Sequence, residues 1–136
     1  MRAPSLLLMN ARTGHAVADT VELAVSRKTR RKGLLGRTGL PLFTGLVLAP
    51  CGAVHTMFMR FAIDVIFVDA AGCVVHVVPH LAPWRAAMAL SARAVVELPA
   101  GTLASRDVAV GDSLYLMPLT GGRLPWSAAD LREAMC

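Results

Sequence analysis

The chain has 136 residues, which suits one compact domain and leaves little room for two. Hydrophobic residues make up 55% of it and charged residues only 17%, a composition that excludes a disordered chain and a coiled coil. Fourteen Lys and Arg side chains against nine Asp and Glu give a formal net charge of +5, which favours an anionic partner such as nucleic acid or a membrane surface.

The first half of the chain is predicted to alternate short strands with one helix. Leu6–Met9 and Val17–Val25 are expected to be strands on either side of a turn. Ser26 is placed to cap a short helix that runs to about Leu35 and ends at Gly36. Further strands are predicted at Leu46–Leu48 and Val54–Met59.

The second half of the chain is predicted to contain the most deeply buried strand. Ile63–Val68 is rich in β-branched and aromatic residues and is expected to form a hairpin with Cys73–Val78. Ala94–Leu98 is the next predicted strand, with Glu97 at an outward-facing position of its alternating pattern. A helical turn near Leu103–Arg106, a tight turn at Val110–Asp112 and a strand at Ser113–Met117 follow.

This order of elements indicates the fold class. Many short strands with few helices favour a β-rich α+β domain, built as a small barrel or as a rolled, mostly antiparallel sheet with two or three short helices. Residues 1–118 are predicted to form this domain. Residues 119–136 are expected to be a Gly- and Pro-containing link and a short C-terminal helix near Leu131–Met135.

The sequence favours a cytoplasmic protein. Its first ten residues include only four consecutive large apolar side chains, too few for a secretion signal. The longest stretch without charged residues, 38–59, could cross a bilayer, but Pro41, Pro50 and three glycines indicate short strands and turns instead. The cysteines are odd in number and form no CxxC pair, so free thiols in a reducing compartment are expected at Cys51, Cys73 and Cys136.

Three motifs together resemble one protein family. They are Arg31-Lys32-Gly33-Leu34-Leu35-Gly36-Arg37, then His55-Thr56-Met57-Phe58-Met59-Arg60-Phe61-Ala62-Ile63-Asp64-Val65, and then Val95-Val96-Glu97-Leu98-Pro99-Ala100-Gly101 with Val110-Gly111-Asp112. Spread over about residues 20–117, they are similar to the bacterial and archaeal family named domain of unknown function 192, in its histidine-bearing branch. Ala62 stands where many members carry Pro. The resemblance implies a compact β-rich domain and no established activity.

Asp64 is a candidate functional residue because it is a carboxylate inside the apolar run of residues 61–68. A buried carboxylate needs a partner, and His55 and Arg60 are the nearest in sequence. A His55–Asp64 pair could act as the general base of a small hydrolase-like enzyme, with Cys51 as a candidate nucleophile. The alternative is a structural role, in which Asp64 accepts backbone N–H groups and Cys51 is a small buried thiol.

The preferred hypothesis is a non-enzymatic module that binds a small ligand or a protein. Polar residues set among apolar strands are typical of a ligand pocket. The candidate groove residues are His55, Met57, Met59, Asp64, Trp84 and Arg85. Trp84 could instead pack over one end of the sheet, since it is large and mostly apolar.

A third hypothesis is anion binding by one basic segment. Six of the fourteen basic side chains belong to residues 27–37: Arg27, Lys28, Arg30, Arg31, Lys32 and Arg37. Outside this segment eight basic side chains meet nine acidic ones, so the rest of the chain is nearly neutral. Nucleic acid or phospholipid could bind here, although nucleic acid is less favoured than the overall charge suggests, and a merely solvated helix face is the alternative.

No metal and no cofactor is predicted. His55, His76 and His80, with Cys51 or Asp64, carry metal-binding groups, but their spacing matches no metal motif. The sequence also lacks a P-loop, a dinucleotide fingerprint and an HExxH motif.

Overall fold

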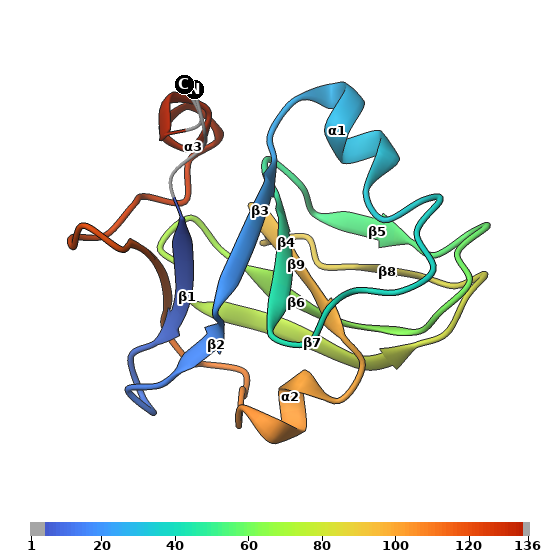
Figure 1. Ribbon diagram of the computed structural model, residues 1–136, viewed down its shortest axis with the longest axis horizontal. Coiled ribbons are helices and arrows are strands. Elements are labelled where there is room, and N and C mark those ends of the chain that lie inside the picture. Colours follow the sequence, from blue (N-terminus) through green and yellow to red (C-terminus); the bar gives the residue numbers. More distant parts are fainter. Residues whose placement is uncertain (1–4, 135–136) are drawn as a thin grey trace.

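The computed structural model describes residues 5–134 as a central sheet with smaller elements on both faces (Figure 1). The central sheet has five strands in the order β3 (Thr20–Ala24), β4 (Thr44–Leu48), β9 (Ala94–Pro99), β6 (Ile63–Val68) and β7 (Val74–Leu81). The β3–β4 pair is parallel and the other pairs are antiparallel. Because β4, β9 and β6 lie inside the sheet, their backbones are paired on both sides.

Two smaller sheets and three short helices complete the described part of the chain. One sheet has the order β10 (Leu114–Pro118), β1 (Leu6–Asn10) and β2 (Ala16–Ala18), and the other pairs β5 (Ala53–His55) with β8 (Ala86–Met88). The helices are α1 (Arg27–Lys32), α2 (Thr102–Ser105) and α3 (Ala128–Ala134). The expected β-rich α+β class with mostly antiparallel strands is thus confirmed. The barrel is not: the strand pairings among residues 5–134 leave three open sheets.

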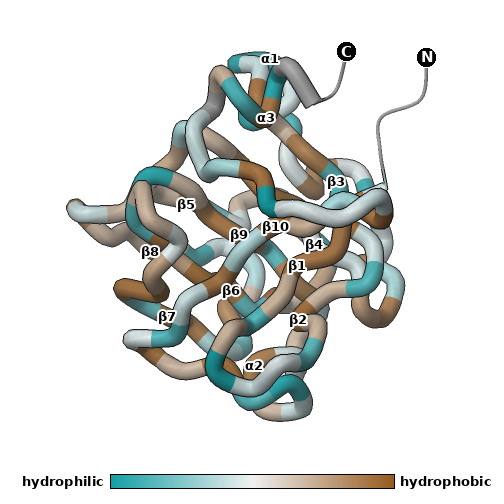
Figure 2. The backbone as a smooth tube through the Cα atoms, turned by 90° about the vertical axis from the view of Figure 1, so that its left-hand side faces the viewer, coloured by the Kyte–Doolittle hydropathy of each residue, from teal (hydrophilic) through white to brown (hydrophobic). Residues whose placement is uncertain are grey.

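The central sheet buries both of its faces. On the face toward the three-stranded sheet, called here the three-strand face, side chains of β6 and β9 such as Ile66, Val96 and Leu98 pack with Leu8 and Leu116. The opposite face, called here the α1 face, forms a second cluster that includes Leu46, Val65, Phe67, Leu34 and Met59. Alternating side chains of one strand therefore enter two different cores. Figure 2 shows the most apolar segments running through the middle of the molecule.

The segment after β10 contributes to the apolar cluster on the three-strand face. Trp126 and Leu131 are buried there, and the Trp126 indole N–H donates to the Leu114 carbonyl at 3.0 Å. Gly72 lies directly under this indole, because a Cβ at Gly72 would stand 2.4 Å from Nε1 and 2.3 Å from the Leu114 carbonyl oxygen. Only glycine allows so close an approach.

Helix α1 begins as the sequence predicts and ends earlier. Ser26 and Thr29 form a reciprocal capping box at its start. The helix stops at Gly33, which has a φ of +48°, and not at Gly36. No residue of α1 is buried. The position of the helix therefore depends on Leu34, two residues after its end, which packs into the cluster on the α1 face. A six-residue helix has little stability of its own, and this anchor fixes where its side chains point.

Several predicted strands have different limits in the structure. The single strand expected at Val17–Val25 is divided at Asp19, whose N–H donates to the Phe43 carbonyl while the chain passes from one sheet to another. The strand expected at Val54–Met59 ends at His55, because the buried Thr56 binds the backbone at Ala82 and Arg85 through its hydroxyl. The short strand β8 has no counterpart among the predictions.

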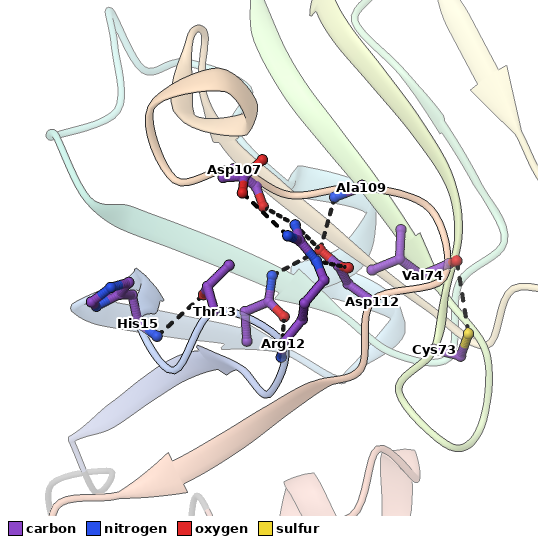
Figure 3. Close-up of polar contacts among 9 residues, drawn as sticks. Arg12, Thr13, His15, Cys73, Val74, Asp107, Ala109 and Asp112 are labelled. Atoms are coloured by element: carbon purple, nitrogen blue, oxygen red, sulfur yellow. Dashed lines mark hydrogen bonds and ion pairs between the residues drawn. The ribbon is translucent and has the colours of Figure 1, made fainter.

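A polar cluster joins the β1–β2 turn to the loop before β10 (Figure 3). The Asp112 carboxylate accepts from Asn10 at 2.8 Å, from the Ala109 N–H at 2.9 Å and from two nitrogens of Arg12 at 2.5 and 3.0 Å. The same guanidinium reaches Asp107. These donors lower the pKa of Asp112 to about 2, with the Arg12 hydrogen bond as the largest cause. Every group of this cluster has a partner within the protein, so the cluster is a clamp between two loops.

Among residues 5–134, no helix has the length and apolar character needed to cross a membrane.

Candidate functional site

A cavity of about 310 Å³ lies between α1, the β5 strand and the α1 face of the central sheet. This α1 cavity has apolar walls formed by Leu34, Leu35, Leu48, Val54 and Met59. Its polar groups fall into two sets. Basic side chains of α1 form one set at the rim, and Cys51, His55 and the buried Glu97 form the other.

The rim of the α1 cavity carries positive charge without a counterion. Its cations are Arg27, Arg30, Arg31 and Lys32, and Lys28 stands on the same helix. Arg30 is anchored, since its guanidinium donates to the Pro50 carbonyl at 2.7 Å. Within residues 5–134, the other four side chains form no ion pair or hydrogen bond. Four cations of one short helix are therefore available to an anion from solution.

Arg37 differs from the rest of the basic segment. Its guanidinium donates to both carboxylate oxygens of Glu22, at 3.0 and 2.9 Å. This bidentate pair lowers the pKa of Glu22 and raises that of Arg37. Arg37 is thus committed within the protein, although it was predicted together with the anion-binding residues.

Glu97 is the buried acid of the cavity. Its side chain is only 3% exposed, yet it receives no hydrogen bond and no ion pair from residues 5–134. Its Oε1 lies 3.7 Å from the point that a Cβ at Gly33 would occupy, which places the carboxyl beneath the end of α1. Burial raises the pKa of Glu97 to about 7, against a smaller opposing effect of Arg37.

The outward position expected for Glu97 is wrong. Its strand was predicted to have one exposed face, but β9 lies between β4 and β6, and the α1 segment with β5 and β8 covers the face toward which Glu97 points. The sequence contained a signal for the burial of Glu97. All the other residues of Ala94–Leu98 are apolar, so both alternating sets of positions in this strand are apolar apart from Glu97. Such a run is typical of a strand buried on both faces, in which a carboxylate is exceptional.

Cys51 and His55 do enter the cavity, but they do not form a nucleophile and base. The Cys51 thiol donates to the Ala53 carbonyl at 3.1 Å, and burial raises its pKa. A thiol with a raised pKa stays protonated and is a weak nucleophile. The His55 Nδ1 accepts the Met57 N–H at 3.3 Å, so this nitrogen is occupied by its own loop.

Asp64 lies on the other face of the sheet from His55. It is 1% exposed and accepts three backbone N–H groups, from His80 at 2.9 Å, Gly101 at 3.0 Å and Leu103 at 2.9 Å. The His80 Nδ1 stands 3.8 Å away. Both carboxylate oxygens are therefore used to hold the end of β7 and the start of α2 against β6. The His55–Asp64 pair that a hydrolase-like mechanism needs is not assembled.

The model of the family called Uncharacterized ACR, DUF192, matches residues 8–116. The chain belongs to DUF192. No curated protein is significantly similar to it.

Two solved structures share the DUF192 fold seen here. One is a Sinorhizobium meliloti 1021 protein described as a proposed transcription regulator, with a TM-score of 0.71 and 24% identity, covering 82% of this chain and 91% of its own. The other is a Novosphingobium aromaticivorans DSM 12444 protein of unknown function, with a TM-score of 0.69 and 23% identity, covering 81% of this chain and 82% of its own. At these identities the likeness shows the fold alone.

The groove predicted for this DUF192 chain is divided by the structure. His55 and Met59 line the α1 cavity, whereas Met57, Trp84 and Arg85 do not. Trp84 is 53% exposed and packs against Phe58, with ring centroids 4.6 Å apart and ring planes tilted by 60°. The two aromatic residues form an exposed pair outside the cavity, and they hold positive φ values of 65° and 64°.

Metal-ligating side chains are scattered in the part of the chain that the structure describes. Residues 5–134 contain no group of three His, Cys, Asp or Glu side chains close enough to hold an ion. The polar chemistry of the cavity is therefore that of an Arg- and Lys-rich rim above one carboxyl. Guanidinium groups bind carboxylate and phosphate through paired N–H donors, and a carboxylate accepts N–H donors.

Proposed function

We propose that this DUF192 domain is a non-enzymatic binding module for a small anionic molecule, which it holds in the α1 cavity. The observation that carries the proposal is the set of three unpaired cations, Arg27, Arg31 and Lys32, that α1 places at the mouth of an apolar cavity. A guanidinium at the edge of an apolar pocket binds an anion more strongly than one in open solvent, because fewer water molecules compete for it.

The size of the site supports a small ligand over a polyanion. The cavity volume of about 310 Å³ is at the lower end of the range for small-molecule pockets. The positive charge is confined to the six residues of α1, whereas duplex nucleic acid presents phosphates along an extended surface.

The chemistry of the cavity supports binding over hydrolysis. Its thiol carries a raised pKa, and its imidazole lies on the opposite face of the sheet from Asp64. A nucleophile with an adjacent base and an orienting group would be needed for covalent catalysis. The residues that line the cavity supply anion-binding groups and one buried acid instead.

The experiment compares two variants of equal net charge. Arg31→Gln removes a rim cation, and Arg123→Gln removes a cation that covers the Tyr115 ring on the three-stranded sheet. Binding of inorganic phosphate and of propionate is measured by calorimetry and by amide chemical shifts on the native protein and both variants. We expect Arg31→Gln to weaken binding about fivefold to tenfold, as the loss of one charge-assisted contact implies, and Arg123→Gln to leave it within twofold.

Two outcomes would reject the proposal. Equal weakening by both variants would mean that the anions respond only to net charge. If neither small anion binds, while duplex DNA or vesicles with phosphatidylglycerol bind in a manner that depends on Arg31, the basic helix serves a polyanion.

A further inference from the structure

The floor of the α1 cavity differs from its rim in the sign of its charge. Glu97 stands at the base and the unpaired cations of α1 stand above it. The site therefore has two ends with opposite electrostatic preferences, and a simple anion would satisfy only one of them.

The carboxyl of Glu97 lacks the partners that a buried acid normally has. Its neighbours across the sheet, Leu46 on β4 and Val65 on β6, are apolar and supply no donor to it. Gly33 approaches from α1 without a side chain. A largely desolvated carboxylate without protein donors is costly, and nearly all buried polar side chains in folded proteins are hydrogen-bonded. Among the described residues no completely buried side-chain oxygen lacks a hydrogen-bond partner, so the Glu97 oxygens are open to the cavity, where a ligand can reach them.

Besides the cations of α1, three other titratable groups lie near Glu97 or share its cavity, and none neutralises it. Arg37 faces it from the segment after α1, but that guanidinium is engaged with both oxygens of Glu22. The charge of Glu97 contributes, after burial, to the raised pKa of Cys51, and the Cys51 thiol donates to the Ala53 carbonyl. His55 also lines the cavity, and its Nδ1 is bound to the Met57 N–H.

We infer that the natural ligand is a small zwitterion, whose protonated amine binds the Glu97 carboxylate while its carboxylate or phosphate binds the α1 rim. This inference rests on the proposed function and names the class of ligand for the same cavity. An ammonium group supplies three N–H donors and one positive charge, which are the two things that the Glu97 carboxylate lacks. A neutral hydroxyl would supply one donor and no charge.

The class includes free amino acids and aminoalkyl phosphates. Because a guanidinium accepts carboxylate and phosphate in similar geometry, both anions are tested. The amine is the part of the ligand that Glu97 selects.

The test uses two matched pairs of probes at pH 8, where the Glu97 carboxyl is mostly ionised and the amines are protonated. β-Alanine is compared with propionate, and phosphoethanolamine with ethyl phosphate. We expect the amine-bearing member of at least one pair to bind the native protein ten times or more as tightly as its partner. In Glu97→Gln the two members should bind within about twofold of each other, while propionate and ethyl phosphate keep their native affinity.

A pH series on the native protein keeps the test decisive even if Glu97→Gln is poorly folded. The amine advantage should disappear as the pH falls from 8 to 5.5, because Glu97 becomes protonated over this range. The same series on His55→Gln separates this effect from protonation of the imidazole, and the loss of the advantage should persist in that variant.

Each negative outcome rejects a different part of the inference. Equal binding of both members of each pair to the native protein overturns the zwitterion and leaves the anion-binding proposal intact. An amine advantage that survives in folded Glu97→Gln, or that is independent of pH, excludes Glu97 as its source. If none of the four probes binds, both the inference and the proposed function are rejected.

Discussion

Asp64 and Glu97 are two buried carboxylates on neighbouring strands, and their surroundings are opposite. Asp64 is 1% exposed and Glu97 is 3% exposed. In the β6–β9 register Asp64 stands across from Leu98, and Glu97 stands across from Val65. This offset of one residue sends Asp64 to the three-strand face and Glu97 to the α1 face.

The two carboxylates differ in what they bind. Three backbone N–H groups converge on Asp64, whereas no residue between 5 and 134 donates to Glu97. A carboxylate whose lone pairs are filled by backbone donors holds loops in place and has no capacity left for a ligand. One that faces a cavity without donors is costly to the folded state and is available for binding. Hydrogen-bond satisfaction therefore distinguishes the two carboxylates, although both are buried.

The largest effect is expected from removal of the satisfied acid. Asp64→Ala leaves the N–H groups of His80, Gly101 and Leu103 without their acceptor. At about 1–3 kcal/mol for each buried donor, the free energy of unfolding should fall by roughly 4 kcal/mol, measured by urea denaturation. Asp19→Ala, at an exposed carboxylate, is the control and should change it by less than about 0.5 kcal/mol. A loss at Asp64 as small as at Asp19 would contradict the structural role.

Removal of the unsatisfied acid should have the opposite sign. The pKa of Glu97 is raised from 4.5 to about 7, so between these pH values the folded state keeps a proton that the unfolded state has lost. The native protein should therefore lose stability as the pH rises from about 4.5 to 7. Glu97→Gln should remove this slope and be more stable above pH 7 by roughly 3 kcal/mol. The measurement is the free energy of unfolding against pH. Parallel curves for the native protein and the variant would show that the pKa of Glu97 is not raised in the folded state.

Asp112 is a third carboxylate to compare with Asp64 and Glu97. Its replacement should have a smaller effect on the stability of the protein. Its pKa is lowered from 3.8 to about 2, so its contribution is complete above pH 4 and is lost as the pH falls toward 2. Because the paired Arg12 side chain is 46% exposed, solvent screening reduces this contribution to about 1 kcal/mol. Thermal unfolding from pH 5 to pH 2 should show a smaller acid-induced fall in Tm for Asp112→Asn than for the native protein. An identical fall in the two proteins would place the acid sensitivity elsewhere.

The smallest effect is expected at the exposed aromatic pair. Trp84→Ala removes a ring that is 53% exposed and packs against Phe58 in a tilted arrangement outside the α1 cavity. We expect the stability to fall by only about 1 kcal/mol, the scale of one exposed aromatic contact, and the phosphate affinity to stay within twofold of native. A loss of affinity as large as that of Arg31→Gln would return Trp84 to the binding site.

Much of the fold could be predicted from local patterns. The apolar run at Ile63–Val68 defines β6, and Ser26 with Thr29 defines the start of α1. The family motifs likewise lie in continuous stretches of sequence. The division of the second predicted strand at Asp19 could not be predicted, because it depends on a backbone bond to Phe43. The strand β8 was missed for a related reason: its three residues are held by pairing with β5 and have no strand pattern of their own.

The candidate site was predicted in pieces. The basic segment, His55, Cys51 and Met59 were each identified, and the structure brings them to one cavity. Asp64 was placed with them and is on the other face of the sheet. Glu97 was assigned to an outward position because its strand was predicted to have one exposed face.

The sequence by itself determined the β-rich class, the family and the concentration of positive charge on one short helix. These properties depend on composition and on neighbours within a few residues. Only the tertiary structure decided which carboxylate is satisfied and which faces the cavity beneath that helix. The reason is that donors to a buried acid come from segments far away in the chain, and a shift of one residue in strand register exchanges the two faces of a sheet.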